Sequence, residues 1–482
     1  MPVSVGQKIE LDIEKIVYGG EGMGYFNDFA VFVPMSVPGD KVEVEIISKK
    51  KNYARGLITK LLSAGAERID DGRVSFEDFH GCDFGMLSYE SQLKYKQQLV
   101  ADVMEKIGGV KDLVVPPTLG SQEIYNYRNK VIEPFAYGKD REIITGMFGK
   151  RSHDVFQVKE NMLSSKLSNK VINKAKEILN RDKNLSVYDE VKHRGILRHI
   201  MTRTNSKNEA MIVLVVNLKK ISKEVEKFLS ELYNQMEEIK SVYVSLNTEK
   251  TNFALGKTMV HLFGEKTIFE EIEGIKFNIS PSSFFQINLE QTKRLYNLGI
   301  SYFDNIENKY IIDAFSGTGT IGMILSKKAQ KIYSIEIVKS AVEDGIKTAK
   351  ENGIENIDFI IGDVNKEIKK LMDMGNKVDS IIFDPPRKGI EEVTLRGLTR
   401  HKIEEIVYIS CNPSTFARDT KILIEEGYSL EKIQPVDMFP QTSHIEVVGK
   451  FSLKKYGVRK IKNQKKRVFP TICQHFSDIK NK

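Results

Sequence analysis

The second half of the chain alternates between short apolar runs and longer amphipathic segments. From about residue 276 the apolar runs are only a few residues long, and helical segments separate them. Strands this short and this uniformly apolar are typical of a parallel sheet that helices cover on both faces. We therefore predict a doubly wound, Rossmann-like α/β domain over residues 276–455. The predicted strands include residues 311–312, 332–335, 359–361, 380–383 and 406–409.

The first 62 residues show a different pattern, in which apolar and polar positions alternate one by one. The alternation is clearest in Lys41–Ile46, and residues 18–24 form a glycine-dense turn. Short strands joined by such turns predict a small β-barrel of the oligonucleotide-binding type. A local basic patch with an aromatic residue contains Lys50 and Arg55, which are candidate contacts for nucleic acid.

Residues 63–275 lie between these two parts and mix helical and extended patterns, which predicts a central α+β domain. A long helix is expected from about Tyr89 to Ile107. Two basic clusters are candidate phosphate contacts, although a solvated surface is the commoner explanation of such clusters. The residues that we assign to RNA from them are Arg128, Lys130 and Arg198.

The positive charge of the protein is concentrated at its carboxyl end. The net charge is +8, and the tail of residues 456–482 alone carries eight Lys or Arg and one Asp. The rest of the chain is almost neutral, so charge alone is weak evidence that the folded body binds nucleic acid. The tail either helps to hold RNA by releasing counterions or is a solvated end, and the sequence leaves both open.

Composition excludes several classes of protein. A hydrophobic content of 41% and a charged content of 29% are ordinary for a soluble protein. The three cysteines, Cys82, Cys411 and Cys473, give neither a disulfide framework nor a zinc site. The amino terminus lacks a signal-peptide pattern, and no apolar stretch approaches the length of a membrane span. We expect a cytoplasmic monomer with no membrane contact and no metal.

A glycine-rich loop follows the first predicted strand of the α/β domain. Gly317, Gly319 and Gly322 have a spacing that lets the backbone approach a ligand where a helix begins. Glu336 ends the next strand, where a carboxylate accepts hydrogen bonds from ribose hydroxyls. Asp363 ends the third strand and is placed to face an adenine amino group. The pattern fits both NAD and S-adenosylmethionine, and the features that follow favour S-adenosylmethionine.

Two further features lie at the ends of later strands. Asp384-Pro385-Pro386-Arg387 is a rigid turn, because its prolines fix φ and provide no backbone donor. Cys411 follows the strand of residues 406–410, so its thiol lies at the same sheet edge as the glycine-rich loop. A free cysteine is usually a small core residue. The loop, the acidic turn and the strand-end thiol together predict a methyltransferase with a cysteine nucleophile.

Five segments of this domain form a specific set: Ser283-Phe284-Phe285-Gln286-Ile287-Asn288, residues 313–320, residues 384–389, residues 410–413 and residues 444–448. The set resembles the RNA uracil-5-methyltransferases that use S-adenosylmethionine, and residues 1–62 resemble a TRAM domain. The resemblance implies that Cys411 is the nucleophile and Glu446 the general base. It also implies contacts to the methyl donor or the target base from Gln286, Phe315, Glu336 and Asp384. We add Gly317, Gly319 and Asp363 to the cofactor contacts and Arg387 to the RNA contacts.

The chain departs from the family pattern at one place. Many members carry a four-cysteine iron–sulfur site in the central domain, and Phe79-His80-Gly81-Cys82 retains only one of its cysteines. Arg73 and Met162 stand near two other ligand positions. A cluster needs about four thiolates, so we predict no iron–sulfur cluster.

The resemblance implies a definite scheme. Attack of a thiolate at carbon 6 of uracil activates carbon 5 toward the sulfonium methyl, and a separate base then removes the carbon 5 proton. Glu446 lies 35 residues after Cys411. An antiparallel last strand, about Ile445–Phe451, would bring the two side chains to one sheet edge. A base inside a folded RNA must be extruded to reach such a site.

Three other functions explain these residues less well. A cytosine-5-methyltransferase shares the thiolate chemistry, but RNA enzymes of that class place a cysteine in the Asp-Pro turn, which here has none. An amino-group methyltransferase would leave Cys411 and Glu446 without a role, and a non-catalytic RNA-binding protein would not need the intact set. Among RNAs, 23S ribosomal RNA is preferred by association with TRAM-bearing members. Transfer RNA stays open, and the sequence does not identify the uridine.

Overall fold

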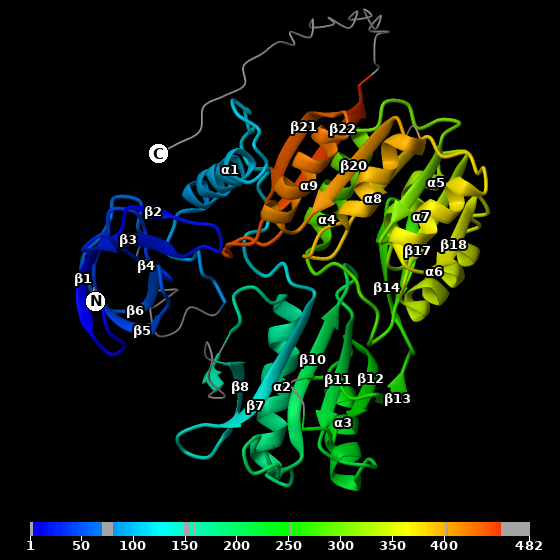
Figure 1. The fold of residues 1–482 in the computed structure, drawn as a ribbon. Helices are drawn as coiled ribbons and strands as arrows, with labels where there is room; N and C mark the ends of the chain where they lie inside the picture. The colour runs from blue at the N-terminus through cyan, green and yellow to red at the C-terminus, as the bar shows by residue number, and fades with distance from the viewer. Residues whose placement is uncertain are drawn as a thin grey trace, which may run out of the picture.

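The computed structural model describes residues 3–69, 81–148, 155–158, 160–250, 253–401 and 403–454 of the 482-residue chain. Within these ranges the chain forms an amino-terminal barrel, a central sheet with two helices and a carboxyl-terminal α/β domain (Figure 1). The predicted basic tail lies outside the described residues. In the described part of the chain, no helix has the length and apolar character needed to cross a membrane.

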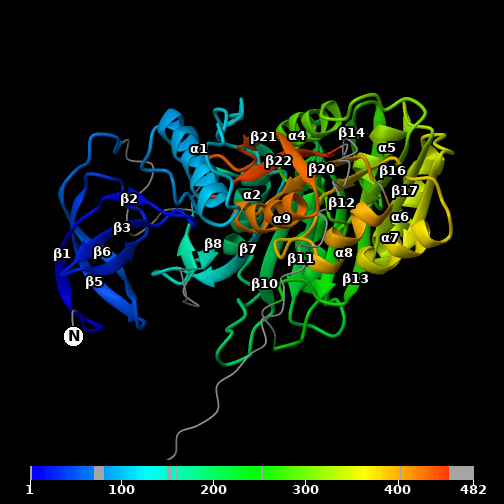
Figure 2. The same cartoon turned by 45° about the horizontal axis from the view of Figure 1, so that its top comes forward.

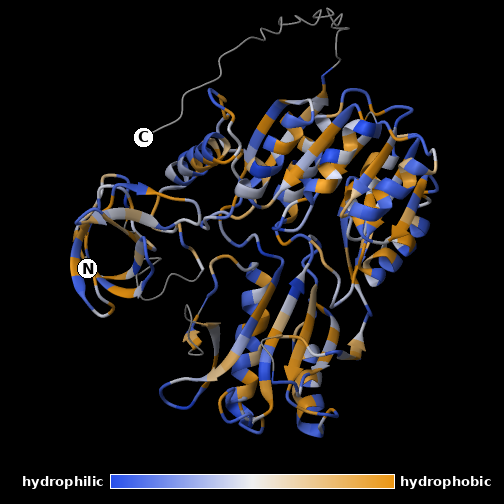
Figure 3. Ribbon diagram, in the orientation of Figure 1, coloured by the Kyte–Doolittle hydropathy of each residue, from blue (hydrophilic) through white to orange (hydrophobic). Residues whose placement is uncertain are grey.

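The barrel is built from strands that alternate between interior and surface. In β5 the side chains of Val42, Val44 and Ile46 are fully buried, while the residues between them are more exposed. Figure 3 shows the same alternation of hydropathy along these strands. The sheet order is β1-β5-β6-β4-β3-β2, and the small barrel predicted for this region is confirmed. The strands are β1 (Lys8–Asp12), β2 (Lys15–Ile16), β3 (Gly22–Phe26), β4 (Phe29–Val33), β5 (Lys41–Lys49) and β6 (Tyr53–Ser63).

The central part is a mostly antiparallel sheet in the order β13-β12-β11-β10-β7-β8-β9. Two amphipathic helices, α2 (Lys166–Asp182) and α3 (Lys223–Gln235), bury their apolar stripes against one face of it. The other face contributes Met201, Met211 and Val213 to a core that it shares with the carboxyl-terminal domain. The strands are β7 (Lys130–Tyr137), β8 (Ile143–Phe148), β9 (Val155–Gln157), β10 (Leu197–Thr204), β11 (Ala210–Val216), β12 (Ile239–Leu246) and β13 (Thr258–Gly264).

The carboxyl-terminal domain has a seven-stranded sheet in the order β18-β17-β16-β19-β20-β22-β21. The first five strands in this order are parallel, and β22 is antiparallel to both of its neighbours. The predicted doubly wound fold is therefore confirmed. The strands are β16 (Tyr310–Ala314), β17 (Lys331–Glu336), β18 (Ile357–Ile361), β19 (Ser380–Phe383), β20 (Glu405–Ser410), β21 (Tyr428–Val436) and β22 (Glu446–Leu453).

Helices cover both faces of this sheet, as Figure 2 shows. One face packs against α4 (Leu289–Ser301), α5 (Thr320–Ser326) and α6 (Lys339–Glu351). The other packs against α7 (Val364–Asp373), α8 (Glu392–Gly397) and α9 (Pro413–Glu425). The sheet order reverses between β16 and β19, and ligands of open α/β sheets bind at the carboxyl ends of the strands at such a point.

Two elements do not follow the predicted domain division: one packs against another domain, and the other contains a predicted boundary. The helix α1 (Tyr89–Lys106) falls in the predicted central domain, but its Val100 and Met104 share a core with Phe416 of α9. The predicted boundary at residues 275 and 276 falls inside the hairpin of β14 (Ile268–Ile272) and β15 (Ile275–Ile279), which packs on the α/β domain. An apolar stripe shows that an element is packed, but it does not show against which partner.

Candidate active site

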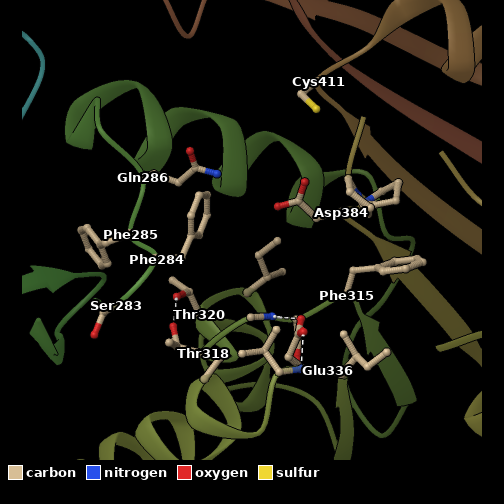
Figure 4. Close-up of a pocket in the computed structure, with 18 of the residues that line it drawn as sticks. Ser283, Phe284, Phe285, Gln286, Phe315, Thr318, Thr320, Glu336, Asp384 and Cys411 are labelled. Carbon is tan, nitrogen blue, oxygen red and sulfur yellow. Dashed lines mark hydrogen bonds between the residues drawn. The ribbon is translucent and has the colours of Figure 1, made fainter. Parts of the chain in front are cut away.

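A cavity of about 820 Å³ opens at the carboxyl ends of the parallel strands. Figure 4 shows Cys411 and Asp384 on one side of it, Gln286 on the opposite side, and Glu336 far from Cys411, beside the glycine-rich loop. The cavity brings together segments that are far apart in sequence, from Ile272 to Glu446. The predicted site residues that line it are Gln286, Phe315, Gly317, Glu336, Asp363, Asp384, Arg387, Cys411 and Glu446.

The glycine-rich loop owes its shape to unusual backbone angles. Phe315, Gly317 and Gly319 have φ values of +61°, +56° and +77°, in the region that favours glycine. Behind the loop, Asp313 is buried and its Oδ2 accepts a hydrogen bond of 2.9 Å from the Gly322 backbone N–H. Burial raises the pKa of Asp313 to about 7. This buried carboxyl fixes the start of α5, which follows the loop, to β16.

Gly319 has a packing role in addition to the predicted cofactor contact. It does not line the cavity, and a Cβ atom at this position would come within 2.7 Å of the Phe359 ring. Gly319 therefore lets α5 begin close to β18. A glycine spacing shows where the backbone must turn, and the contact of Gly319 with a cofactor stays a prediction.

Backbone N–H groups hold the carboxylates of Glu336 and Asp363, the two acidic residues predicted to contact the cofactor. Glu336 accepts hydrogen bonds from the N–H groups of Gly317 (3.0 Å) and Val338 (2.8 Å), one on each carboxylate oxygen. Each oxygen retains further acceptor capacity, and the carboxylate is fixed in the cavity wall. Asp363 is the N-cap of α7, and its Oδ1 accepts from the Asn365 N–H at 2.9 Å.

Three acidic groups share the other side of the cavity. Burial raises the pKa of Asp384 to about 7, and burial followed by the charge of Asp384 raises the pKa of Glu446 well above its usual range. The pKa of the Cys411 thiol is raised to about 11, first by burial and then by the charges of Glu446 and Asp384. The guanidinium of Arg387 lowers the pKa values of Cys411 and Glu446. The groups titrate as one electrostatic unit.

The central domain holds the segment that carries Gln286. Asn129 donates from its side chain to the Gln286 carbonyl (3.0 Å) and from its backbone to the Ile287 carbonyl (2.8 Å). The guanidinium of Arg203 donates to the Ser283 carbonyl. Sequence reasoning missed both supporting residues, because neither lies in the α/β domain whose loop it fixes.

Phe284 was also missed as a site residue. It lines the cavity with 74% of its side chain exposed, while its neighbour Phe285 is buried in the core. Figure 4 shows the Phe284 ring between the Gln286 amide and the glycine-rich loop. The signal in the sequence was the pair of adjacent phenylalanines, since the two cannot both face the same core.

The predicted RNA contacts differ in how far their side chains are exposed. Lys50 and Arg387 are exposed, and Arg55 forms an ion pair with Glu21 (3.0 Å) on the barrel. Burial lowers the pKa of Lys130 to about 8, with a smaller effect from the charge of Arg203. These four, and the half-buried Arg128, remain candidates for RNA binding.

Arg198 requires a correction. Its side chain is only 4% exposed, and its guanidinium donates to the carbonyls of Asn247 (3.0 Å) and Glu249 (2.8 Å). It also lies over the Tyr188 ring. The structure therefore gives Arg198 an internal role. The basic cluster that was predicted to bind phosphate lies partly in β10, whose residues are buried.

Cys82 lies in a small apolar cluster with Tyr127 and Leu163, against which Met162 packs. Arg73, Phe79 and His80 lie outside the described residues. Among the residues that the structure does describe, no group of three or more His, Cys, Asp or Glu could hold a metal ion.

The α/β domain is doubly wound, and its glycine-rich loop, strand-end carboxylates and strand-end cysteine are typical of methyltransferases that use S-adenosylmethionine. The amino-terminal barrel is of a type that binds nucleic acid. Residues 88–455 match the tRNA (Uracil-5-)-methyltransferase family, and residues 2–59 match the TRAM domain. The chain belongs to this family, and it is an S-adenosylmethionine-dependent RNA methyltransferase.

Relatives of known sequence agree with this assignment. An uncharacterized RNA methyltransferase of Fusobacterium nucleatum is 60% identical, over 93% of this chain and 96% of its own length. One from Clostridium tetani is 39% identical, over 93% of this chain and 97% of its own. Among solved structures, the tRNA (uracil-54, C5)-methyltransferase of Pyrococcus abyssi in complex with S-adenosyl-L-homocysteine has a TM-score of 0.74 and 26% identity. The match covers 92% of this chain and 100% of that one.

The cavity fits S-adenosylmethionine on its own chemistry. Ser316 lines it, and within the described residues its hydroxyl is buried without a hydrogen-bond partner, which is a rare state for a polar group. The oriented Glu336 carboxylate suits ribose hydroxyls, and Asp363 and Gln286, which also line the cavity, supply further polar groups. The volume lies in the range of ordinary small-molecule sites.

Proposed function

We propose that this protein methylates carbon 5 of a uridine in RNA, with Cys411 as the nucleophile and Glu446 as the general base. The observation that supports this most is the meeting of two distant side chains at one cavity. Cys411 follows β20, Glu446 begins β22, and both line the cavity that holds the candidate cofactor residues. A thiol and a separate carboxyl are the two groups that carbon 5 chemistry of uracil requires.

Cys411 and Glu446 act in successive steps of the proposed reaction. The Cys411 thiolate forms a bond to carbon 6 of the uracil, which places electron density on carbon 5. S-adenosylmethionine, when bound, supplies the methyl group for carbon 5. The Glu446 carboxylate then accepts the carbon 5 proton, the electrons of that C–H bond restore the ring double bond, and the carbon–sulfur bond breaks to release the Cys411 thiolate.

The electrostatics of the cavity bear on when the thiolate forms. With a pKa of about 11, the Cys411 thiol is protonated in the free protein near neutral pH. Arg387 is the cation that favours its ionised form, and it lies in the Asp-Pro-Pro-Arg turn beside the cavity. We propose that binding of the target base, which changes the solvation of this cavity, accompanies thiolate formation. A thiol that is inert without substrate is protected from oxidation and stray alkylation.

Two classes of RNA are candidates for the target. Ribosomal RNA is the first, by association of the TRAM barrel with enzymes of that kind. Transfer RNA is the second, and the Pyrococcus abyssi protein, named as a tRNA (uracil-54, C5)-methyltransferase, matches 92% of this chain.

Release of tritium from RNA labelled at carbon 5 of uracil tests the reaction. We expect one tritium released for each methyl group incorporated, because only a carbon 5 enzyme removes that hydrogen. Methyl incorporation without tritium release would show that another atom is methylated. Mapping 5-methyluridine in ribosomal and transfer RNA of a strain lacking the gene, with and without the complementing gene, then identifies the RNA class.

A further inference from the structure

A turn of the barrel reaches the catalytic edge of the α/β domain. Tyr18 lies in this turn, residues 17–21, and its hydroxyl donates a hydrogen bond of 2.7 Å to the Oδ1 atom of Asn412. The two residues are 394 positions apart in sequence. Asn412 directly follows Cys411, so a residue of the barrel is bonded to the neighbour of the proposed nucleophile.

Asn412 joins three other elements at this point. Its Oδ1 accepts from the Ser414 N–H (3.1 Å) and so caps the start of α9, while its Nδ2 donates to the Arg387 carbonyl (2.9 Å). The side chain therefore connects the segment of Cys411, the helix that follows and the Asp-Pro-Pro-Arg turn. A bond that fixes Asn412 also fixes the backbone from which the Cys411 thiol projects.

The turn is packed closely enough to make this contact specific. Gly20 has a φ of +81°, and a Cβ atom there would lie 2.3 Å from the Cβ of Ser443 and 3.1 Å from the Phe84 ring. Ser443 lies three residues before Glu446, and its hydroxyl donates to Asp83. The turn thus lies against the segments that lead to both proposed catalytic residues.

The ring of Tyr18 is available to a ligand as well. Tyr18 is 44% exposed and stands near Arg387 and Cys411. Burial raises the pKa of its hydroxyl, the charge of Arg387 lowers it, and the charge of Cys411 raises it. Exposed aromatic rings and guanidinium planes are the groups on which proteins stack unpaired RNA bases. Because Arg387 and Cys411 both line the cavity, Tyr18 lies beside the place where a target uridine would be bound.

We propose that Tyr18 is a positioning residue that couples RNA on the barrel to the catalytic segment. Its hydroxyl holds Asn412, and its ring receives a base next to the target uridine. This inference rests on the proposed uridine methylation, and it adds a residue outside the catalytic domain to that site. It also predicts that the barrel does more than raise affinity for RNA, because its turn completes the edge of the active site.

Two variants separate the roles of the hydroxyl and the ring. Tyr18→Phe removes one neutral hydrogen bond, so kcat for tritium release should fall about 3- to 10-fold with KM for RNA unchanged. Tyr18→Leu also removes the ring, so KM for RNA should rise about tenfold or more. S-adenosylmethionine binding, measured by calorimetry, should stay within about twofold for both, because the turn does not line the cofactor region. The matched control is Tyr25→Phe, an exposed tyrosine of the same barrel, which should behave as wild type.

A double-mutant comparison tests the bond itself. Asn412→Ser keeps a residue type that caps helices but cannot reach Tyr18. In that background Tyr18→Phe should cause no further loss, whereas additive losses would show that the two residues act separately. Normal kcat in Tyr18→Phe together with normal KM in Tyr18→Leu overturns the proposal. If the wild type releases no tritium, the proposed function fails instead, and filter binding of RNA to Tyr18→Leu still decides whether the ring contacts RNA.

Discussion

Ser410 at the end of β20 pairs with Val447 at the start of β22 in an antiparallel ladder. The next positions along the two strands are Cys411 and Glu446, which therefore lie side by side at the edge of the sheet. The predicted antiparallel last strand is confirmed, and with it the topological argument that unites two residues 35 positions apart. The electrostatics agree, since burial and then the charge of Glu446 raise the pKa of the Cys411 thiol.

Replacement of Glu446 by glutamine should separate the two halves of the reaction. Glutamine keeps the size and polarity of the side chain but cannot accept the carbon 5 proton as a carboxylate does. Thiol addition and methyl transfer can still proceed, so methylated RNA should accumulate on Cys411. Loss of a general base costs about 10²–10⁴ in rate, which makes the adduct visible on a denaturing gel. Normal turnover of Glu446→Gln would remove this residue from the role of base.

Replacement of Cys411 by alanine should abolish methyl transfer and leave S-adenosylmethionine affinity within a few-fold. RNA containing 5-fluorouridine provides the direct test, because fluorine replaces the proton that must be removed. The wild type should form a denaturation-resistant adduct, and Cys411→Ala should form none. The matched control is Cys82→Ala, which alters the other cysteine of the described residues and should retain the adduct. An adduct that persists in Cys411→Ala contradicts the assignment.

Much of the site was open to prediction because it is built from strand ends. A strand that stops at a loop must deliver its last residues to the edge of the sheet, so the spacing of Asp313, Asp384 and Cys411 was sufficient to place them together. The doubly wound fold followed from short apolar runs, because both faces of such a sheet are covered. These inferences needed only local pattern and a general rule of topology.

The parts that escaped prediction depend on contacts between domains. The bond from Tyr18 to Asn412 and that from Asn129 to the Gln286 carbonyl join residues 394 and 157 positions apart, and no periodicity records such a pairing. The burial of Arg198 was hidden for a related reason. An arginine in a run of basic residues is normally predicted to be exposed. Here backbone carbonyls accept the hydrogen bonds of the buried Arg198 guanidinium.

Protein purified without air should contain far less iron than one cluster per chain, and it should lack visible absorbance. The physical reason is the ligand set, since Cys82 is the cysteine retained of the expected thiolates and it packs with Tyr127 and Leu163. Methyl transfer should continue after treatment with an iron chelator. Iron near a full cluster per chain, with matching absorbance, would overturn the prediction.

Replacement of Lys96 by methionine should destabilise the α/β domain. The Lys96 ammonium lies 2.6 Å from the Asp437 carboxylate, and both side chains are fully buried. Removal of one partner leaves an uncompensated buried charge, which costs about 3–5 kcal/mol. The midpoint of thermal unfolding should fall, and Lys96→Met combined with Asp437→Asn should recover part of the loss. An unchanged midpoint in the single variant would show that water or another cation compensates Asp437.

Replacement of Asp384 by asparagine should make the protein more stable at pH 8 while impairing methylation. The pKa of Asp384 is about 7 in the folded protein against an ordinary value of 3.8, because of burial. The folded protein therefore binds this proton more tightly than the unfolded chain, so its stability falls as the pH rises from about 4 to about 7. Asparagine carries no such charge. Relative to wild type, Asp384→Asn should gain about 1–3 kcal/mol at pH 8 and almost nothing at pH 4.

Thermal unfolding at the two pH values measures this difference, and Asp28→Asn, an exposed turn residue on the barrel, is the matched control. The control should shift little at either pH, whereas the Asp384 variant should gain stability only at the higher one. Its methylation should fall nevertheless, because the carboxyl lies in the cavity wall beside Cys411. A residue that is retained at a cost in stability is typical of an active site. Equal stability of Asp384→Asn and wild type at pH 8 would show that the carboxylate is solvated there and that its burial does not cost stability.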